Sequence, residues 1–326
     1  MDSADAKRTH AATEPEQNSR APAASDFFQD RLTIGTALEA GQIGIWSWNA
    51  ASNTVTWSSN VESICGLPAG SFDGTFAFVS RTIHEDDRDG VIGSLNEAWR
   101  NEQPYWARYR MAPNGNGEER WIESIGTLMP EGAAPRVMVG ACYDVTERIK
   151  LERELRSRVK QQQALAQFGE RALAESDLER LLSDVVNTVA LTLPVDLVEV
   201  IELLPGNSDL LLRAGFGWKS GYVGSVVTSR TEGHYAWHIL ESAVPIVVDD
   251  FAAEKRFVIP QYLCDHHCVS GASTTIAGRD GRAYGILGVC IKKPWPFTLQ
   301  ETSFLAAVGN LVAGAIQRRQ LEDPTN

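Results

Sequence analysis

The chain has 326 residues, a length that predicts about two domains with a tail or connector to spare. Its 30 basic and 42 acidic residues give a net charge of −12 at pH 7, and this excess of negative charge disfavours a nucleic-acid partner. Apolar residues make up 43% of the chain, which is enough for ordinary globular cores and excludes a wholly disordered polymer.

The cysteine content indicates the compartment. The five cysteines are Cys65, Cys142, Cys264, Cys268 and Cys290. A sparse, odd set suits a reducing environment better than a disulfide scaffold, so the sequence predicts a cytoplasmic protein. Residues 1–25 lack an apolar core segment and predict a disordered tail, not a secretory signal. The uncharged run near the C-terminus is too short to cross a bilayer, so no membrane span is predicted.

Residues 26–146 form the first predicted domain. Its expected elements are a lead-in helix near 26–38, strands at 43–48 and 54–57, helical turns at 61–65 and 86–101, and strands at 105–111, 118–128 and 136–143. The strands are indicated by alternation of apolar and polar residues, and Asn-Gly-Asn-Gly at 114–117 suits a tight turn.

A helical connector is predicted over 147–175. Asp144 with Glu147 three residues later is a capping-box pattern that starts a helix where the last strand stops. An approximate seven-residue apolar spacing follows, but Gln162 and Gly169 interrupt it. The connector is therefore expected to form a short, weak coiled coil.

A second α+β domain is predicted over 176–318, with a tail over 319–326. A helical period over 178–193 comes first, and the expected strands are 195–204, 209–216, 245–249, 273–277 and 283–291. Thr298 and Glu301 form a second capping-box pattern before a final helix with one broad apolar face.

The first domain resembles a PAS domain with a PAC motif, over about residues 33–150. The resemblance rests on Gly44–Trp48 with Trp57 and Ser58, on Cys65–Pro68, on Ile83–Arg88, on Gly117–Trp121, and on the exit Asp144–Arg148. The family usually has proline where this chain has Glu85. The resemblance implies an antiparallel sheet with flanking helices around a pocket, and a signal that leaves through Asp144, Thr146 and Glu147.

The second domain resembles a GAF domain, over about residues 165–320. The segments that carry this resemblance are Arg213–Trp218, Val248–Phe251, Arg256–Phe257, Val269–Gly271, Gly278–Arg282, Gly285–Val289 and Phe297–Thr298. Such tandems occur in bacterial sensory proteins, including two-component systems. The implied architecture is two α+β sensory domains joined by a long signalling helix, and the implied pocket residues of the GAF domain are Tyr235, His238, His266 and Ser270.

Six aromatic residues of the PAS domain are candidates to line its pocket, and a plain core role is the alternative. They are Trp46, Trp48, Trp57, Trp106, Tyr109 and Trp121. No haem, flavin or bilin motif is recognised: residues 91–105 contain no histidine for an axial bond, and Ser63–Gly66 does not match the photoreactive Asn-Cys-Arg-Phe pattern. His84 is expected to be a surface or capping group. The cofactor is therefore unknown.

Cys264–Cys268 is the sharpest chemical cluster in the sequence, with His266 and His267 between the two cysteines. If this segment is helical, the two thiols share a face and could bind a metal ion or sense redox state. A structural histidine with buried thiols is the favoured alternative, because the ligand set is incomplete. Arg213–Gly221 is glycine-rich but has Trp218 before Lys219, which predicts a strand end and loop, not a phosphate loop.

The sequence predicts a non-catalytic, cytoplasmic PAS–GAF sensory module. It is expected to bind a small ligand or partner, to pair as a homodimer through the connector and C-terminal helices, and to act on a separate output protein. One alternative is the input half of a sensor histidine kinase or diguanylate cyclase; after Phe297 only one helix is expected, and it contains no histidine. The other alternative is a metal or redox sensor at Cys264–Cys268.

Overall fold

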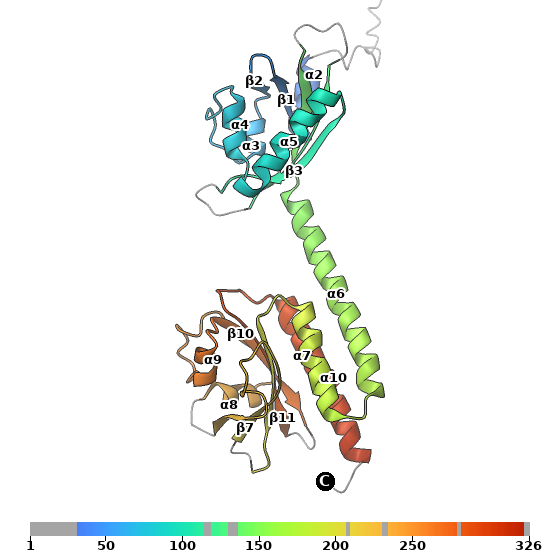
Figure 1. The fold of residues 1–326 in the computed structure, drawn as a ribbon, viewed down its shortest axis with the longest axis vertical. Helices are drawn as coiled ribbons and strands as arrows, with labels where there is room; N and C mark the ends of the chain where they lie inside the picture. The colour runs from blue at the N-terminus through green and yellow to red at the C-terminus, as the bar shows by residue number, and fades with distance from the viewer. Residues whose placement is uncertain are drawn as a thin grey trace, which may run out of the picture. The chain divides into compact units, whose positions relative to one another are not determined.

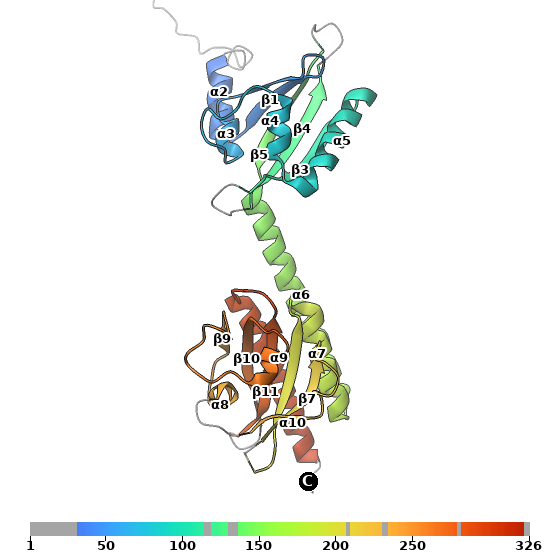
Figure 2. The ribbon, with the colours of Figure 1, turned by 60° about the vertical axis from the view of Figure 1, so that its left-hand side comes forward.

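The chain divides into two compact units, Met1–Leu151 and Glu152–Asn326. The computed structural model describes residues 31–113, 119–129, 136–206, 209–229, 234–278 and 282–322. Each unit combines helices with one antiparallel sheet (Figures 1 and 2), which confirms the predicted α+β fold class. The predicted tail at 1–25 and the turn at 114–117 lie outside the described residues. No helix of the described ranges combines the length and apolar character needed to cross a membrane.

The first unit contains one five-stranded sheet in the order β2-β1-β5-β4-β3. Its elements are α2 (Arg31–Ala40), β1 (Gly44–Asn49), β2 (Thr54–Trp57), α3 (Val61–Ile64), α4 (Phe76–Thr82), α5 (Glu85–Asn101), β3 (Tyr105–Arg110), β4 (Trp121–Leu128) and β5 (Met138–Asp144). The predicted hairpin and the three-stranded meander are confirmed. The sequence reading missed α4, a short helix whose first turn is capped by the Thr75 side chain.

Two glycines make room for Trp46 in this sheet. Trp46 pairs with Gly140 on β5, and Gly140 pairs with Gly126 on β4. A Cβ atom on Gly140 would lie 2.3 Å from the indole Cζ2, and one on Gly126 would lie 2.6 Å from Cη2. The indole therefore lies across both glycines, and it meets Tyr105 of β3 edge-on with 5.8 Å between ring centroids.

Helix α6 (Thr146–Ala174) leaves the sheet directly after β5, which confirms the predicted helical connector. Its first turn is held by Asp144, whose Oδ1 accepts a hydrogen bond from the Thr146 N–H at 2.9 Å. Thr146 Oγ1 in turn accepts from the Trp121 N–H at 2.9 Å. Only half of the predicted capping box forms, because the Glu147 carboxylate pairs with Lys150 instead.

The second unit contains one six-stranded sheet in the order β8-β7-β6-β11-β10-β9. Its elements are α7 (Leu178–Thr192), β6 (Leu197–Leu203), β7 (Asp209–Phe216), β8 (Val226–Ser229), α8 (Tyr235–Leu240), β9 (Ile246–Val248), α9 (Gln261–Asp265), β10 (Ser270–Ala277), β11 (Ala283–Ile291) and α10 (Leu299–Glu322). One apolar core lies between the sheet and α7, α10 and the end of α6, and a second lies on the other face beneath α8 and α9. Because both faces are covered, the central strands are buried on both sides.

The C-terminal helix differs from prediction at its end. The predicted capping box is confirmed: the Glu301 N–H donates to Thr298 Oγ1 at 3.2 Å, and the Thr298 N–H donates to Glu301 Oε2 at 2.8 Å. The helix continues through Glu322, so the first residues of the predicted tail at 319–326 are helical. Arg318 and Arg319 extend the packing, because their guanidinium groups donate to backbone carbonyls at Ala172 and Glu175. The sequence patterns did not predict α8 or β8.

Candidate functional site

A cavity of about 60 Å³ lies between the first sheet and helices α3, α4 and α5. This volume holds a few water-sized occupants without any rearrangement. Among the described residues, no charged side chain lines it. Indole and hydroxyl groups in its wall come from Trp46, Trp48, Trp57, Ser80, Tyr105, Tyr109 and Ser124.

The cavity wall presents hydrogen-bond donors that have no protein acceptor. The indole Nε1 atoms of Trp46 and Trp48 are buried, and neither has a hydrogen-bond partner among the described residues. Burial raises the pKa of the Tyr105 and Tyr109 hydroxyls, so both stay protonated. A buried donor without a partner carries a desolvation penalty of about 1–3 kcal/mol, which an acceptor on a bound molecule would relieve.

Four of the six predicted pocket residues line this cavity: Trp46, Trp48, Trp57 and Tyr109. Trp106 and Trp121 do not line this cavity. Trp106 is 57% exposed, because the alternation of β3 turns Tyr105 and Tyr109 inward and Trp106 outward. Trp121 begins β4, and its indole N–H donates to Glu119 Oε2 at 2.8 Å, away from the cavity.

Sequence reasoning missed the two thiols in the cavity wall. Cys65 follows α3, Cys142 lies on β5, and both are buried. A hydrogen bond between the two thiols, together with burial, raises the pKa of Cys65, so it remains a neutral thiol. The cavity is therefore uncharged on every side that the structure describes.

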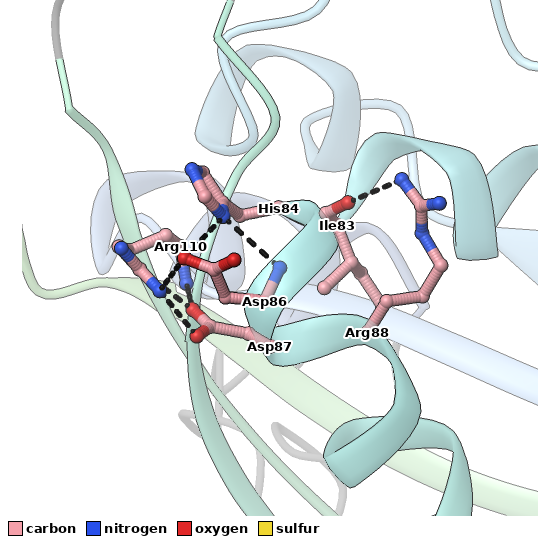
Figure 3. Close-up of polar contacts among 6 residues, drawn as sticks. All are labelled: Ile83, His84, Asp86, Asp87, Arg88 and Arg110. Carbon is pink, nitrogen blue, oxygen red and sulfur yellow. Dashed lines mark hydrogen bonds and ion pairs between the residues drawn. The ribbon is translucent and has the colours of Figure 1, made fainter.

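The acidic motif at the start of α5 is structural (Figure 3). Arg110 at the end of β3 donates to both carboxylate oxygens of Asp87, at 2.9 and 2.6 Å, and its Nη2 also lies 3.3 Å from Asp86 Oδ2. The bond from Arg110 holds the pKa of Asp87 below its ordinary value. His84 Nδ1 accepts from the Asp86 N–H at 3.3 Å, which confirms the predicted capping role. This network fastens α5 to β3.

One arginine links the cavity wall to the connector. The Arg120 guanidinium donates to the carbonyl oxygens of Ser63 and Ile64 at 3.1 and 2.9 Å, and it lies 3.1 Å from Asp144 Oδ2. Gly66 permits this approach: its φ is +69°, and a Cβ atom there would lie 2.8 Å from Arg120 Nε. Asp144 then holds the first turn of α6.

The predicted relay residues differ in their contacts. Asp144 and Thr146 join the sheet to α6, as described above. Glu147 does not take part in this link, because its side chain is 81% exposed and pairs only with Lys150 among the described residues. Arg120, which the sequence reading did not single out as a relay residue, occupies the position between α3 and Asp144.

The four predicted GAF pocket residues are not gathered around one site. The Tyr235 hydroxyl lies 3.1 Å from Ser273 Oγ, and His238 is exposed against the Phe257 ring. His266 uses both ring nitrogens, because Nε2 accepts from the Lys219 N–H and Nδ1 lies 2.8 Å from the Tyr262 carbonyl oxygen. Ser270 bonds to the backbone on both sides of β10. His266 and Ser270 therefore hold loops.

The candidate metal residues are also separated. Helix α9 ends at Asp265, and His267 has a φ of +57°, so Cys264 and Cys268 do not share a helical face. Cys264 is exposed, whereas Cys268 is partly buried. In the ranges that the structure describes, no group of three or more His, Cys, Asp or Glu side chains is arranged to hold a metal ion.

Two antiparallel sheets with flanking helices, the first of which encloses a small cavity, are an arrangement typical of sensory domains. The family models agree: that of the PAS fold matches residues 54–142, and that of the GAF domain matches residues 177–316. The chain carries a PAS domain followed by a GAF domain, as the sequence predicted.

Solved structures with similar folds include three bacterial proteins. A GAF domain of a phosphoenolpyruvate-protein phosphotransferase from Coxiella burnetii is 20% identical, with 51% of this chain and 98% of that chain covered and a TM-score of 0.46. A sensory box histidine kinase/response regulator from Burkholderia thailandensis is 28% identical, with 38% and 92% covered and a TM-score of 0.32. The chromophore-binding domain of a Stigmatella aurantiaca bacteriophytochrome is 12% identical, with 83% and 93% covered and a TM-score of 0.39. No curated protein matches the sequence.

Proposed function

We propose that this chain is a non-catalytic, cytoplasmic sensory module whose PAS cavity binds a small molecule and whose helix α6 carries the change to a separate output protein. The observation that carries the proposal is the Arg120 bridge, which joins the wall of an uncharged cavity to the first turn of α6. The sparse cysteine content supports a reducing compartment.

The cavity wall indicates the chemistry of the ligand. The wall offers unpartnered indole N–H groups at Trp46 and Trp48 and no charged group among its described residues. A charged ligand would lose its hydration without a counter-charge. The complementary ligand is therefore small, neutral and mostly apolar, with a carbonyl or another hydrogen-bond acceptor.

The bridge gives a route by which occupancy can reach the connector. Val61 and Cys65 line the cavity on either side of the α3 carbonyls that Arg120 binds. A ligand that moves α3 changes the geometry of those hydrogen bonds. It thereby changes the position of the Arg120 guanidinium beside Asp144. A ligand shifts the equilibrium of α6 only by the difference between its affinities for the two arrangements.

Amide hydrogen exchange with acetophenone, a neutral carbonyl-bearing probe that must displace α3 and widen the cavity of about 60 Å³ to enter, tests this route. In the wild-type chain the probe should slow exchange in α3 and in the first two turns of α6. In Arg120→Met the probe should still protect α3 but should no longer protect α6, because the bridge to Asp144 is absent. The control is Arg100→Met, at the exposed end of α5. Absence of probe binding, or equal protection of α6 in both arginine variants, contradicts the proposal.

The exposed face of α6 supports a homodimer. Leu151 and Leu155 are 63% exposed and Val159 is 43% exposed, although all three are apolar. Their spacing of four residues places them along one side of the helix. We propose that a second copy of the chain covers this stripe in a parallel coiled coil, with α10 contributing to the pairing.

A charge placed in the stripe should separate the subunits. Leu155→Glu should raise the dimer dissociation constant by about tenfold or more, because two carboxylates would then face each other at the seam. Ser157→Glu adds the same charge on the opposite side of α6 and should leave the dimer intact. Native mass spectrometry across a dilution series measures both. A monomeric wild-type chain, or equal dimerisation of the two variants, refutes the homodimer.

A further inference from the structure

A buried carboxyl group in the GAF domain has no counter-charge among the described residues. Glu199 on β6 is 2% exposed and lies on the face of the sheet beneath α8 and α9. Its Oε1 accepts a hydrogen bond from the Tyr262 hydroxyl at 3.3 Å, whereas Oε2 has no partner among the described residues. A buried carboxyl is costly unless a complementary group satisfies it, so Glu199 requires an explanation.

The sheet is built to accommodate this side chain. Glu199 pairs with Gly288 on β11 and with Gly215 on β7, so a glycine lies on each side of it. A Cβ atom on Gly288 would lie 2.8 Å from Glu199 Oε1 and 2.9 Å from Ser273 Oγ. On the other side, a Cβ atom on Gly215 would lie 2.5 Å from the Trp218 indole. The two glycines leave the space that the carboxyl and its neighbours occupy.

Aromatic rings surround the carboxyl in place of cations. Tyr262 of α9 packs against Trp218, with 5.4 Å between ring centroids. Tyr235 of α8 reaches Ser273 on β10 and packs against Phe257 at 5.0 Å. Among the described residues, the other titratable group facing Glu199 is Cys290 of β11, and burial and hydrogen bonding keep it, like the two tyrosines, neutral.

We infer that Glu199 is the anchor of a GAF-domain site for a small organic cation, with a protonated nitrogen on an apolar body. A carboxylate supplies the counter-charge, and electron-rich ring faces attract a desolvated ammonium or amidinium group. An inorganic cation would need several oxygen ligands, and the neighbours of Glu199 are mostly apolar rings. The inference extends the proposed sensory function to the second domain.

Access requires the loop over residues 217–224 to lift, because the site is closed in this structure. Gly217, Gly221 and Gly224 all have positive φ, a conformation that favours glycine. Hydrogen bonds from Lys219 and Tyr222 to His266 and Asp265 hold the loop down. The loop carries Trp218, so its opening would uncover Tyr262 and the carboxyl beneath.

Protonation provides a specific readout. Burial raises the pKa of Glu199 to about 8, so the free site is mostly protonated at pH 7. A bound cation favours the carboxylate, and the site should therefore release close to one proton as it fills. Titration calorimetry in two buffers of different ionisation enthalpy counts the released protons.

The experiment uses the full chain with benzylammonium and benzamidinium, each compared with its neutral counterpart, benzyl alcohol or benzamide. At least one cation should bind with proton release, and its neutral counterpart should bind more weakly by about tenfold or more. Glu199→Gln keeps the acceptor for Tyr262 and should abolish both the preference for the cation and the proton release. Glu241→Gln, at the exposed end of α8, should change neither.

Three results would overturn the inference: no binding of either cation, equal binding of the neutral molecules, or unchanged cation binding in Glu199→Gln. Circular dichroism confirms that the variant is folded before it is titrated. Protection of α3 and α6 by acetophenone is measured separately in the PAS domain, so the failure of one proposal leaves the other standing.

Discussion

Glu199→Gln should make the GAF domain more stable at pH 8.5 and should remove most of the dependence of its stability on pH. The folded-state pKa of Glu199 is raised by burial to about 8, against 4.5 for an ordinary glutamate. Between these pH values the native state holds a proton that the unfolded chain has lost. The wild-type free energy of unfolding therefore falls as pH rises from 4.5 to 8, and the stabilising contribution is fully present only below that window.

The size of the change in the free energy of unfolding follows from the difference between the folded-state and unfolded-state pKa values of Glu199. Each pKa unit corresponds to about 1.4 kcal/mol, so the loss across the window is on the order of 5 kcal/mol at most. Glutamine is neutral at every pH and can still accept the hydrogen bond from Tyr262. The variant should therefore gain a few kcal/mol over the wild type at pH 8.5 and little at pH 5.

Urea unfolding with pulsed hydrogen exchange measures this effect, because peptides from β6 and β11 report on the GAF domain alone. Glu241→Gln removes an exposed carboxylate from the same domain and should preserve the wild-type slope. If Glu199→Gln and Glu241→Gln show the same dependence on pH, Glu199 is ionised in the folded state and the account of its burial is wrong.

Gly140→Ala should destabilise the PAS domain by about 3 kcal/mol, because overpacking of a rigid core typically costs 1–3 kcal/mol and a backbone clash adds to it. The new Cβ atom would lie 2.2 Å from the Ile125 carbonyl oxygen and 2.3 Å from the Trp46 indole. The Trp46 indole cannot move away easily, because it packs over the two glycines and edge-on against the Tyr105 ring.

Gly93→Ala is the matched control for this prediction. Gly93 lies inside α5 with no atom within 4 Å of the position of a Cβ. Alanine there should raise the free energy of unfolding by about 1 kcal/mol, through better helix propensity. Urea unfolding followed at peptides from β1 and β5 compares the two variants. If Gly140→Ala is as stable as the wild type, the Trp46 indole does not pack against Gly126 and Gly140 as described.

Local patterns predicted the elements of this fold because their signals lie within short windows. The hairpin around 43–57, the connector and the Thr298–Glu301 capping box each depend on neighbours a few residues apart. Helix α8 escaped prediction, since six residues are too few to establish a helical period. Cys264 and Cys268 could share a face only if the whole segment were helical, and α9 ends at Asp265.

The cavity was only partly predictable, because its lining depends on which face of each strand turns inward. On β3 the sequence did contain the signal: Trp106 shares its parity with Arg108 and Arg110, and arginines belong outside. Glu199 carries no such local signal. It is buried because α8 and α9, distant in sequence, cover the second face of β6.

Because hydrogen bonds fix the start of α6 at the sheet, the length of α6 determines on which side of the helix the apolar stripe lies. Asp144 and Thr146 fix the rotational phase of the first turn, and each further residue turns the helix by about 100°. Inserting a single residue before Leu151 would swing the apolar stripe to another side, whereas seven residues would return it to within about 20°. Insertions that keep the stripe on the same side of α6 relative to its first turn are therefore expected to have about seven or eleven residues.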